Sequence, residues 1–113
     1  MLPTKRRVKK ESFAKIMKDG VFLHAPNLYL RFLDRKDESP SLFGFVVPNK
    51  VKKTSVGRHL IKRRLTTIVE KLLLEIKDGF SGILFVKKDI TPLPTLDIEK
   101  EITDLLKKAK ILS

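Results

Sequence analysis

The chain contains no cysteine and no tryptophan, and its 13 acidic residues are outnumbered by its basic ones. Without cysteine, the protein can form neither a disulfide framework nor a cysteine-ligated zinc site. No apolar run approaches the roughly 18 residues that would cross a bilayer. The basic N-terminus is not followed by the apolar stretch of a secretory signal. We therefore expect a soluble, cytoplasmic protein.

Residues that usually carry catalysis are also scarce. The five glycines are scattered and form no phosphate-binding loop of the Walker or Rossmann type. His24 and His59 lie in separate elements, with no carboxylate cluster beside either, so no metal-ligand spacing is present. Ser12, Ser55 and Ser81 have no His–Asp pairing near them in the sequence. The sequence therefore predicts no catalytic residue and no metal site in this protein.

Positive charge is what the chain has in abundance. The 113 residues include 25 Lys+Arg, and the formal net charge is +12. The excess is confined to two segments: residues 1–20 hold seven basic and two acidic groups, and residues 50–64 hold seven basic groups and no acidic one. Two such segments predict a polyanionic partner, with nucleic acid ahead of an anionic membrane surface. Solvated faces without any partner are the remaining interpretation.

The length of the chain predicts one domain over residues 1–113. Hydrophobic periodicity predicts three helices and three strands in it. The helices are expected at 12–18, 56–77 and 96–111, and the strands at 27–33, 42–47 and 82–86. Ser12 or Glu11 is expected near the start of the first helix, and Gly20 is expected to end it in the left-handed conformation. Residues 34–40 are expected to form the turn of a hairpin. The order α-β-β-α-β-α predicts an α+β sandwich, with helices packed on a mostly antiparallel sheet.

The first predicted strand alternates in character. Leu28, Leu30 and Phe32 point to one face, and Tyr29 and Arg31 point to the other. The more apolar face is expected to meet the core. By contrast, residues 82–86 are apolar throughout, which predicts a central strand buried on both faces.

Residues 50–64 form a basic loop followed by the start of the longest predicted helix, which Thr54 or Ser55 can cap. Apolar residues occupy one arc of this helix, and Arg58, His59, Lys62 and Arg63 are expected on the adjoining arc. Arginines along a rigid helix suit a structured phosphate backbone. The predicted RNA-binding residues are Lys50, Lys52, Lys53, Arg58, His59, Lys62, Arg63 and Arg64.

Residues 46–65 (VVPNKVKKTSVGRHLIKRRL) resemble the signature of the bacterial ribonuclease P protein family. Residues 7–20 and 82–88 resemble the flanking parts of the same family, so the resemblance covers almost the whole chain in order. Four departures stand out. His59 replaces the usual Asn, Leu60 replaces the usual second Arg, Pro48-Asn49 replaces Ser-Lys, and Met17 replaces an aromatic residue.

The resemblance implies a protein subunit that binds the catalytic RNA of ribonuclease P and precursor tRNA, as a monomer in a 1:1 complex with the RNA and with no membrane partner. Mg²⁺ would accompany the RNA subunit, and the protein alone would bind no cofactor. The resemblance also implies a fold like the second domain of a small-subunit ribosomal protein, with a left-handed β-α-β crossover. The residues implied to bind the 5′ leader are Phe13, Met17, Tyr29 and Arg31.

Three alternatives stay open at this point. Phe13 and Met17 could serve core packing alone, because so short a helix needs an anchor. The whole chain could be a structural RNA-binding protein of the ribosomal type, without a catalytic partner. A basic membrane-surface module is the third class.

Overall fold

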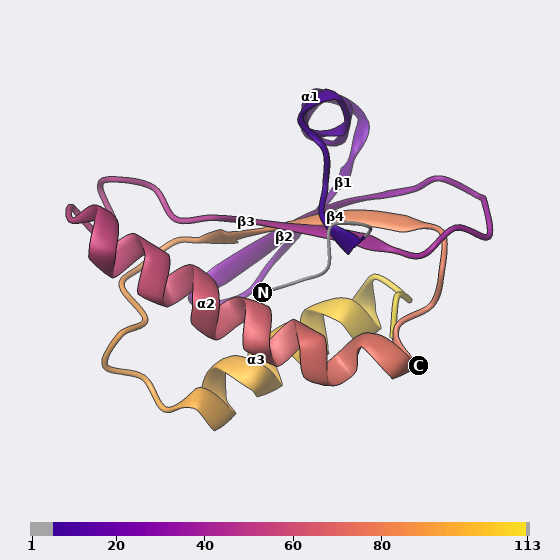
Figure 1. Cartoon of the computed structure of the whole chain (residues 1–113). Coiled ribbons are helices and arrows are strands. Elements are labelled where there is room, and N and C mark those ends of the chain that lie inside the picture. Colours follow the sequence, from indigo (N-terminus) through magenta and orange to yellow (C-terminus); the bar gives the residue numbers. More distant parts are fainter. Residues whose placement is uncertain (1–5, 113) are drawn as a thin grey trace.

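The computed structural model describes residues 6–112, so the first five residues of the basic N-terminal segment lie outside it. A four-stranded sheet has helix α1 on one face and helices α2 and α3 on the other (Figure 1). The elements are α1 (Lys10–Asp19), β1 (Val21–His24), β2 (Leu28–Asp34), β3 (Leu42–Val46), α2 (Ser55–Leu72), the 3₁₀ helix η2 (Leu73–Glu75), β4 (Phe80–Val86) and α3 (Thr95–Lys108).

The predicted α+β class and the order of the predicted elements are confirmed, with one strand added. Sequence reasoning missed β1, a four-residue strand that directly follows α1 and is mostly exposed. The strand order is β1-β2-β4-β3. The β1–β2 and β2–β4 pairs are antiparallel, and the β3–β4 pair is parallel. The chain from β3 through α2 to β4 therefore forms a β-α-β unit.

The predicted hairpin between β2 and β3 is wrong, because β4 lies between these strands. The Arg35 guanidinium explains the path of residues 34–40. It donates to the carbonyl oxygen of Phe80 (2.7 Å) and to Ser81 Oγ (2.6 Å) at the start of β4. It also donates to Asp37 Oδ2 (3.0 Å) and to the carbonyl oxygen of Pro40 (3.0 Å) within the loop. These bonds fasten the loop across the start of β4 instead of closing a tight turn.

Two apolar layers cover the two faces of the sheet. The larger one contains Leu28, Leu30 and Phe32 of β2, as predicted, together with the apolar sides of α2 and α3. The smaller one lies under α1 and is built on Ile16, Ile83 and Phe85. The predicted burial of β4 on both faces is confirmed, because Ser81 through Val86 are all buried.

Helix α1 begins two residues before the predicted range, at Lys10, after an N-cap at Lys9 that makes no side-chain hydrogen bond. Glu11 and Ser12 lie near its start, as predicted, but the helix does not end in the predicted conformation. Gly20 has φ −72°, so it is extended and not left-handed. Glycine is needed there for another reason. A Cβ at position 20 would lie 2.4 Å from the carbonyl oxygen of Ile16 and 3.0 Å from that of Phe32.

Candidate RNA interface

Helix α2 begins where the sequence predicts, at a threonine cap. The Thr54 hydroxyl accepts a hydrogen bond from the Gly57 backbone N–H (3.1 Å). A Cβ on residue 57 would lie 2.7 Å from Thr54 Oγ1, so glycine leaves room for the cap. The first turn of α2 contains no acidic residue. Its N-terminal dipole therefore adds to the positive potential of the lysines before it.

One stripe in the first half of α2 carries exposed basic groups. His59, Lys62 and Arg63 follow at the i, i+3, i+4 spacing of a single helix face. They line a groove of about 480 Å³ together with Arg7 of the N-terminal segment and Phe43 of β3. Sequence reasoning did not include Arg7 among the RNA-binding residues. Only the tertiary fold shows that residue 7 pairs with Phe43 at the outer edge of β3.

Arg58 does not share this stripe. It lies three residues before Ile61 and seven before Leu65, which places it in line with the buried side of the helix. Its guanidinium donates from Nη1 to the carbonyl oxygens of Lys52 (3.0 Å) and Lys53 (2.8 Å). The prediction that Arg58 lies on the same helix arc as His59, Lys62 and Arg63 is therefore wrong. Its side chain instead holds the backbone of the lysine loop in place.

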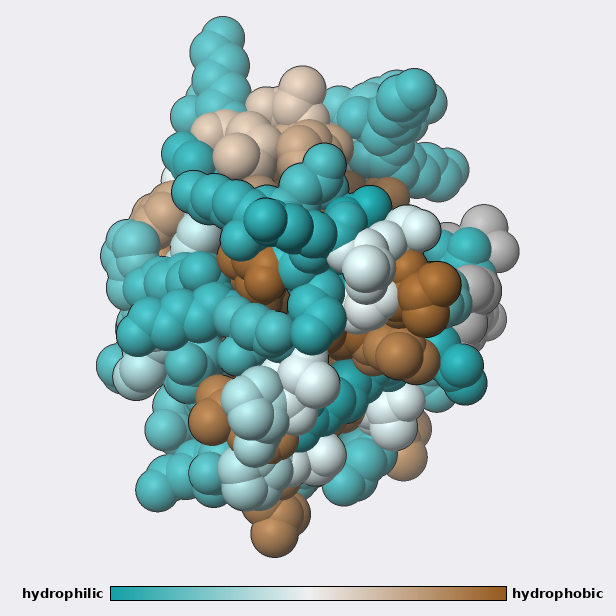
Figure 2. Space-filling view, turned by 90° about the vertical axis from the view of Figure 1, so that its left-hand side faces the viewer, coloured by the Kyte–Doolittle hydropathy of each residue, from teal (hydrophilic) through white to brown (hydrophobic). Residues whose placement is uncertain are grey.

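Lys50 and Lys53 are exposed in the loop before α2, whereas Lys52 is half-buried and forms an ion pair with Asp89 (3.0 Å). The pKa of Asp89 is lowered to about 2. Hydrogen bonds from the Thr91 hydroxyl and backbone N–H are the main cause, and Lys52 contributes further. This pair joins the β3–α2 loop to the β4–α3 loop. Figure 2 shows the side where both loops lie, covered largely by hydrophilic residues with hydrophobic groups visible between them.

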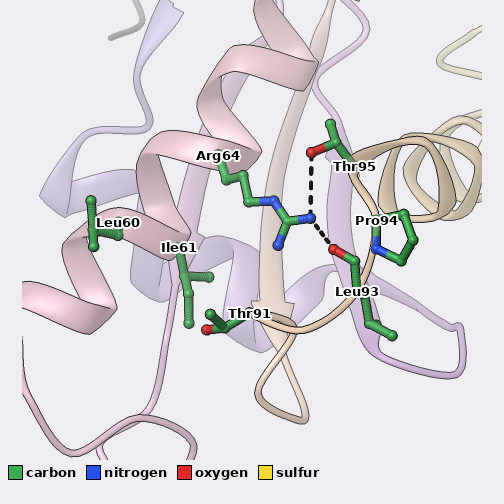
Figure 3. A pocket seen from close by; sticks show the side chains of 7 residues that line it. All are labelled: Leu60, Ile61, Arg64, Thr91, Leu93, Pro94 and Thr95. Atoms are coloured by element: carbon green, nitrogen blue, oxygen red, sulfur yellow. Dashed lines mark hydrogen bonds between the residues drawn. The ribbon is translucent and has the colours of Figure 1, made fainter.

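Arg64 points to the other side of α2, toward the loop before α3 (Figure 3). Its Nη1 donates to the carbonyl oxygen of Ile90 (2.9 Å), and its Nη2 donates to the carbonyl oxygen of Leu93 and, at 3.4 Å, to Thr95 Oγ1. Leu60 lies one turn earlier on the same stripe, and both residues line a cavity of about 330 Å³. The structure therefore does not bring Arg64 together with His59, Lys62 and Arg63.

The residues implied to bind the leader all lie on the α1 face of the sheet. Tyr29 is stacked between Phe22 (ring centroids 4.6 Å apart) and Phe85 (4.5 Å). The Arg31 guanidinium lies 5.1 Å from the centroid of Phe22. Phe13 of α1 lies 6.5 Å from Phe85, at the other end of the row. Met17 packs against the same apolar layer.

We define the aromatic row as Phe22, Tyr29, Phe85 and Phe13. Both faces of Tyr29 are covered by neighbouring rings, so Tyr29 offers no free face for a base. Phe22 and Phe13 are each 38% exposed and end the row. Sequence reasoning missed Phe22 because it did not predict β1. A signal was available, since Phe22 and His24 alternate with Val21 and Leu23 directly after the glycine.

Arg31 has an unusual environment. Its Nε is buried and has no hydrogen-bond partner among residues 6–112. Within the same described range, no group of three or more His, Asp or Glu side chains could hold a metal ion. No helix in this range is long and apolar enough to span a membrane. The chemistry that these side chains offer is binding of anions and of aromatic bases.

Comparison with known proteins places these features in a family. The family described as Ribonuclease P matches residues 2–110. A ribonuclease P protein component from a Pseudanabaena species is 31% identical over 113 residues, covering 99% of this chain and 97% of that protein. One from Synechococcus elongatus is 31% identical, covering 98% and 95%.

Solved structures show the same fold at lower identity. The ribonuclease P protein of Staphylococcus aureus superposes with a TM-score of 0.83 at 22% identity, covering 98% of this chain and 100% of that one. The protein from Thermotoga maritima superposes with a TM-score of 0.81 at 21% identity, covering 90% and 96%. These matches agree with the sandwich described above.

Proposed function

Because this chain belongs to the ribonuclease P protein family, the protein subunits of a tRNA-processing ribonucleoprotein endoribonuclease, we propose that it holds the catalytic RNA and the 5′ leader of precursor tRNA on two separate surfaces. The observation that carries the proposal is the placement of the aromatic row and the basic side of α2 on opposite faces of one sheet. A protein with two such surfaces can touch two polyanions at once.

The surface for the catalytic RNA consists of the exposed cations at the start of α2. Lys50 and Lys53 extend from the loop, and Lys62 and Arg63 extend from the helix. Each cation that meets a phosphate releases condensed counterions, which favours association at low salt. Lys52 and Arg58 contribute by fixing the loop, through the Asp89 ion pair and the two carbonyl bonds described above. His59 can add a hydrogen bond to phosphate.

The surface for the leader is the aromatic row with Arg31. Bases of a single strand stack on aromatic and guanidinium planes without demanding a particular sequence. The most accessible positions are Phe22 and Phe13, each 38% exposed. Tyr29 stacks on Phe22, and the His24 ring lies 4.4 Å from the Phe22 ring. A buried donor without a partner is costly, so an RNA acceptor that draws the Arg31 guanidinium outward would relieve that cost.

Catalysis itself is assigned to the RNA subunit, with Mg²⁺ bound there. The protein would act as a monomer in a 1:1 complex with this RNA in the cytoplasm. Its contribution is to lower the repulsion between catalytic RNA and substrate and to orient the leader. None of the relatives favours the alternative of a ribosomal structural protein, since those compared are ribonuclease P protein components.

The first test is 5′ cleavage of precursor tRNA by a bacterial catalytic RNA at low Mg²⁺. The wild-type chain should accelerate cleavage, and the absence of any acceleration would contradict the proposal.

The second test separates the two surfaces. In the assembled holoenzyme, Phe22→Ala with Arg31→Ala should weaken binding of precursor tRNA at least about fivefold, because each stacked base contributes on the order of 1–3 kcal/mol. Binding of mature tRNA, which lacks the leader, should not change. Leu74→Ala is the matched control, because Leu74 is fully exposed in η2. Equal losses for both tRNAs would refute the leader assignment.

A further inference from the structure

The groove beside α2 has an apolar floor that a purely phosphate-binding surface would not need. Phe43 is buried in it and Phe45 is half-buried, whereas Val8 reaches the lining from the edge of β3 and packs against the layer under α1. Phe43 and Phe45 pair with Gly82 and Leu84 of β4, so they face the α2 side of the sheet. The aromatic row faces α1, so the groove is a different surface.

The wall of the groove is one continuous stripe of α2. His59, Lys62, Arg63, Thr66 and Thr67 recur at gaps of three and one, as residues on one side of a helix do. Arg7 contributes from the opposite wall. None of the ten residues that line the groove is acidic. The groove therefore matches both parts of a nucleotide. Its apolar floor suits the flat base, and its cationic rim suits the charged phosphate.

We propose that this groove takes one unstacked nucleotide of the catalytic RNA, with its base against Phe45 and its flanking phosphates on Lys62 and Arg63. The inference rests on the proposed function for the identity of the RNA. The volume of about 480 Å³ lies in the range of small-ligand pockets. Bases splayed out of a folded RNA are a common target for proteins, because their faces and edges are then free.

A peptide is a poorer occupant of the same groove. An extended peptide would dock by pairing with the outer edge of β3. That edge is already occupied at Phe43, whose carbonyl oxygen accepts the Val8 N–H (3.1 Å). The rim cations and the Thr66 hydroxyl suit the polar edges of a nucleotide better than an apolar helix, while the Thr67 hydroxyl donates to the carbonyl oxygen of Arg63 (2.9 Å).

The first experiment uses single nucleotides on the isotope-labelled full chain. Adenosine 5′-monophosphate, ribose 5-phosphate and inorganic phosphate are titrated at one ionic strength and followed by NMR. The adenosine nucleotide should shift the Phe45 ring and Thr66 methyl signals and bind at least threefold more tightly than ribose 5-phosphate. Equal affinities, with shifts confined to Lys62 and Arg63, would show that only phosphate binds and would overturn the proposal.

The second experiment fills the groove without changing charge. Thr67 is exposed at its rim, so Thr67→Trp should fold and obstruct the base site, and Leu74→Trp is the control on η2. Loss of one stacked base lowers affinity roughly 5- to 150-fold, so we expect Thr67→Trp to weaken binding of the catalytic RNA about tenfold. The slope of log K against log[salt] should stay the same. Lys62→Gln should instead reduce the magnitude of this slope by about one.

The outcomes separate this inference from the proposed function. If Thr67→Trp binds the catalytic RNA as tightly as Leu74→Trp does, and the wild-type chain still accelerates cleavage, the base site is wrong and the function stands. If the wild-type chain does not bind the catalytic RNA, the proposed function fails, and the nucleotide titration alone decides whether the groove is a base site.

Discussion

Arg64 lies in the most basic stretch of the chain, yet we predict that it stabilises the fold and is not a phosphate ligand. Its guanidinium donates to the carbonyl oxygens of Ile90 and Leu93 and reaches Thr95 at 3.4 Å. These bonds fasten α2 to the loop that leads into α3. Arg64→Met keeps the aliphatic part of the side chain and removes all of these donors.

The size of the effect follows from the number of bonds. Hydrogen bonds with a charged partner contribute about 1.5–3 kcal/mol each. The site is partly exposed, so the lower end applies to the two carbonyl bonds, and the 3.4 Å contact adds little. The expected loss in the free energy of unfolding is therefore about 3 kcal/mol. In a domain of this size, such a loss lowers Tm by roughly 10 °C.

Arg63→Met is the matched control, because Arg63 is exposed in the groove one residue earlier. Urea denaturation should show a change within about 0.5 kcal/mol for Arg63→Met. RNA binding should show the opposite order, with the salt slope reduced by about one for Arg63→Met and unchanged for Arg64→Met. An Arg64→Met protein as stable as wild type, with a reduced salt slope, would refute the anchoring role.

Three further outcomes are expected. For binding of the catalytic RNA, log K should fall with log[salt] at a slope of about −3.5 to −7. This slope corresponds to five to eight phosphate contacts, made mainly by residues 50–64. A slope shallower than about −2 would contradict this prediction. Gly20→Ala should lower the free energy of unfolding by roughly 1–3 kcal/mol, because the added Cβ would lie 2.4 Å from the Ile16 carbonyl oxygen. Urea denaturation measures this change, and an unchanged midpoint of the unfolding transition would contradict the close contact. The pKa of Asp89 is lowered to about 2, so its contribution to stability is complete above about pH 4 and is lost as the pH falls toward 2. Stability measured against pH should be flatter in that range for Asp89→Asn, and identical curves would be evidence against the Asp89 contacts.

Local patterns of the sequence predicted the parts of the fold that depend on periodicity. The apolar faces of β2, α2 and α3 are buried as expected, because each pattern repeats over several turns or several strand residues. The pairing of strands is not local. The hairpin prediction failed because β4 lies between β2 and β3. Its start, which Arg35 binds, is some 45 residues away in the chain, and nothing within residues 27–47 reveals this partner.

In the candidate site, too, the sequence predicted local features and missed non-local contacts. Net charge identified residues 50–64, but it does not predict which acceptors a guanidinium binds. Arg58 and Arg64 donate to backbone carbonyls of neighbouring loops, and Lys52 pairs with Asp89, so three of the eight predicted RNA-binding residues make bonds within the protein. Phe22 and Arg7 were missed because each depends on strand pairing, one at β1 and the other at the edge of β3.

The rotation of helix α2 explains why Leu60 can stand where the family usually has an arginine. At about 100° per residue, α2 has three stripes: one in the core, one in the groove, and one toward the loop before α3. Leu60 and Arg64 share the third stripe and line the same cavity. The exchange at position 60 therefore leaves the cations of the groove untouched, and the groove keeps Lys62 and Arg63 as its phosphate ligands. An arginine at position 60 would extend beside the anchor of Arg64, away from the groove, so Leu60→Arg should leave nucleotide binding in the groove unchanged in the NMR titration.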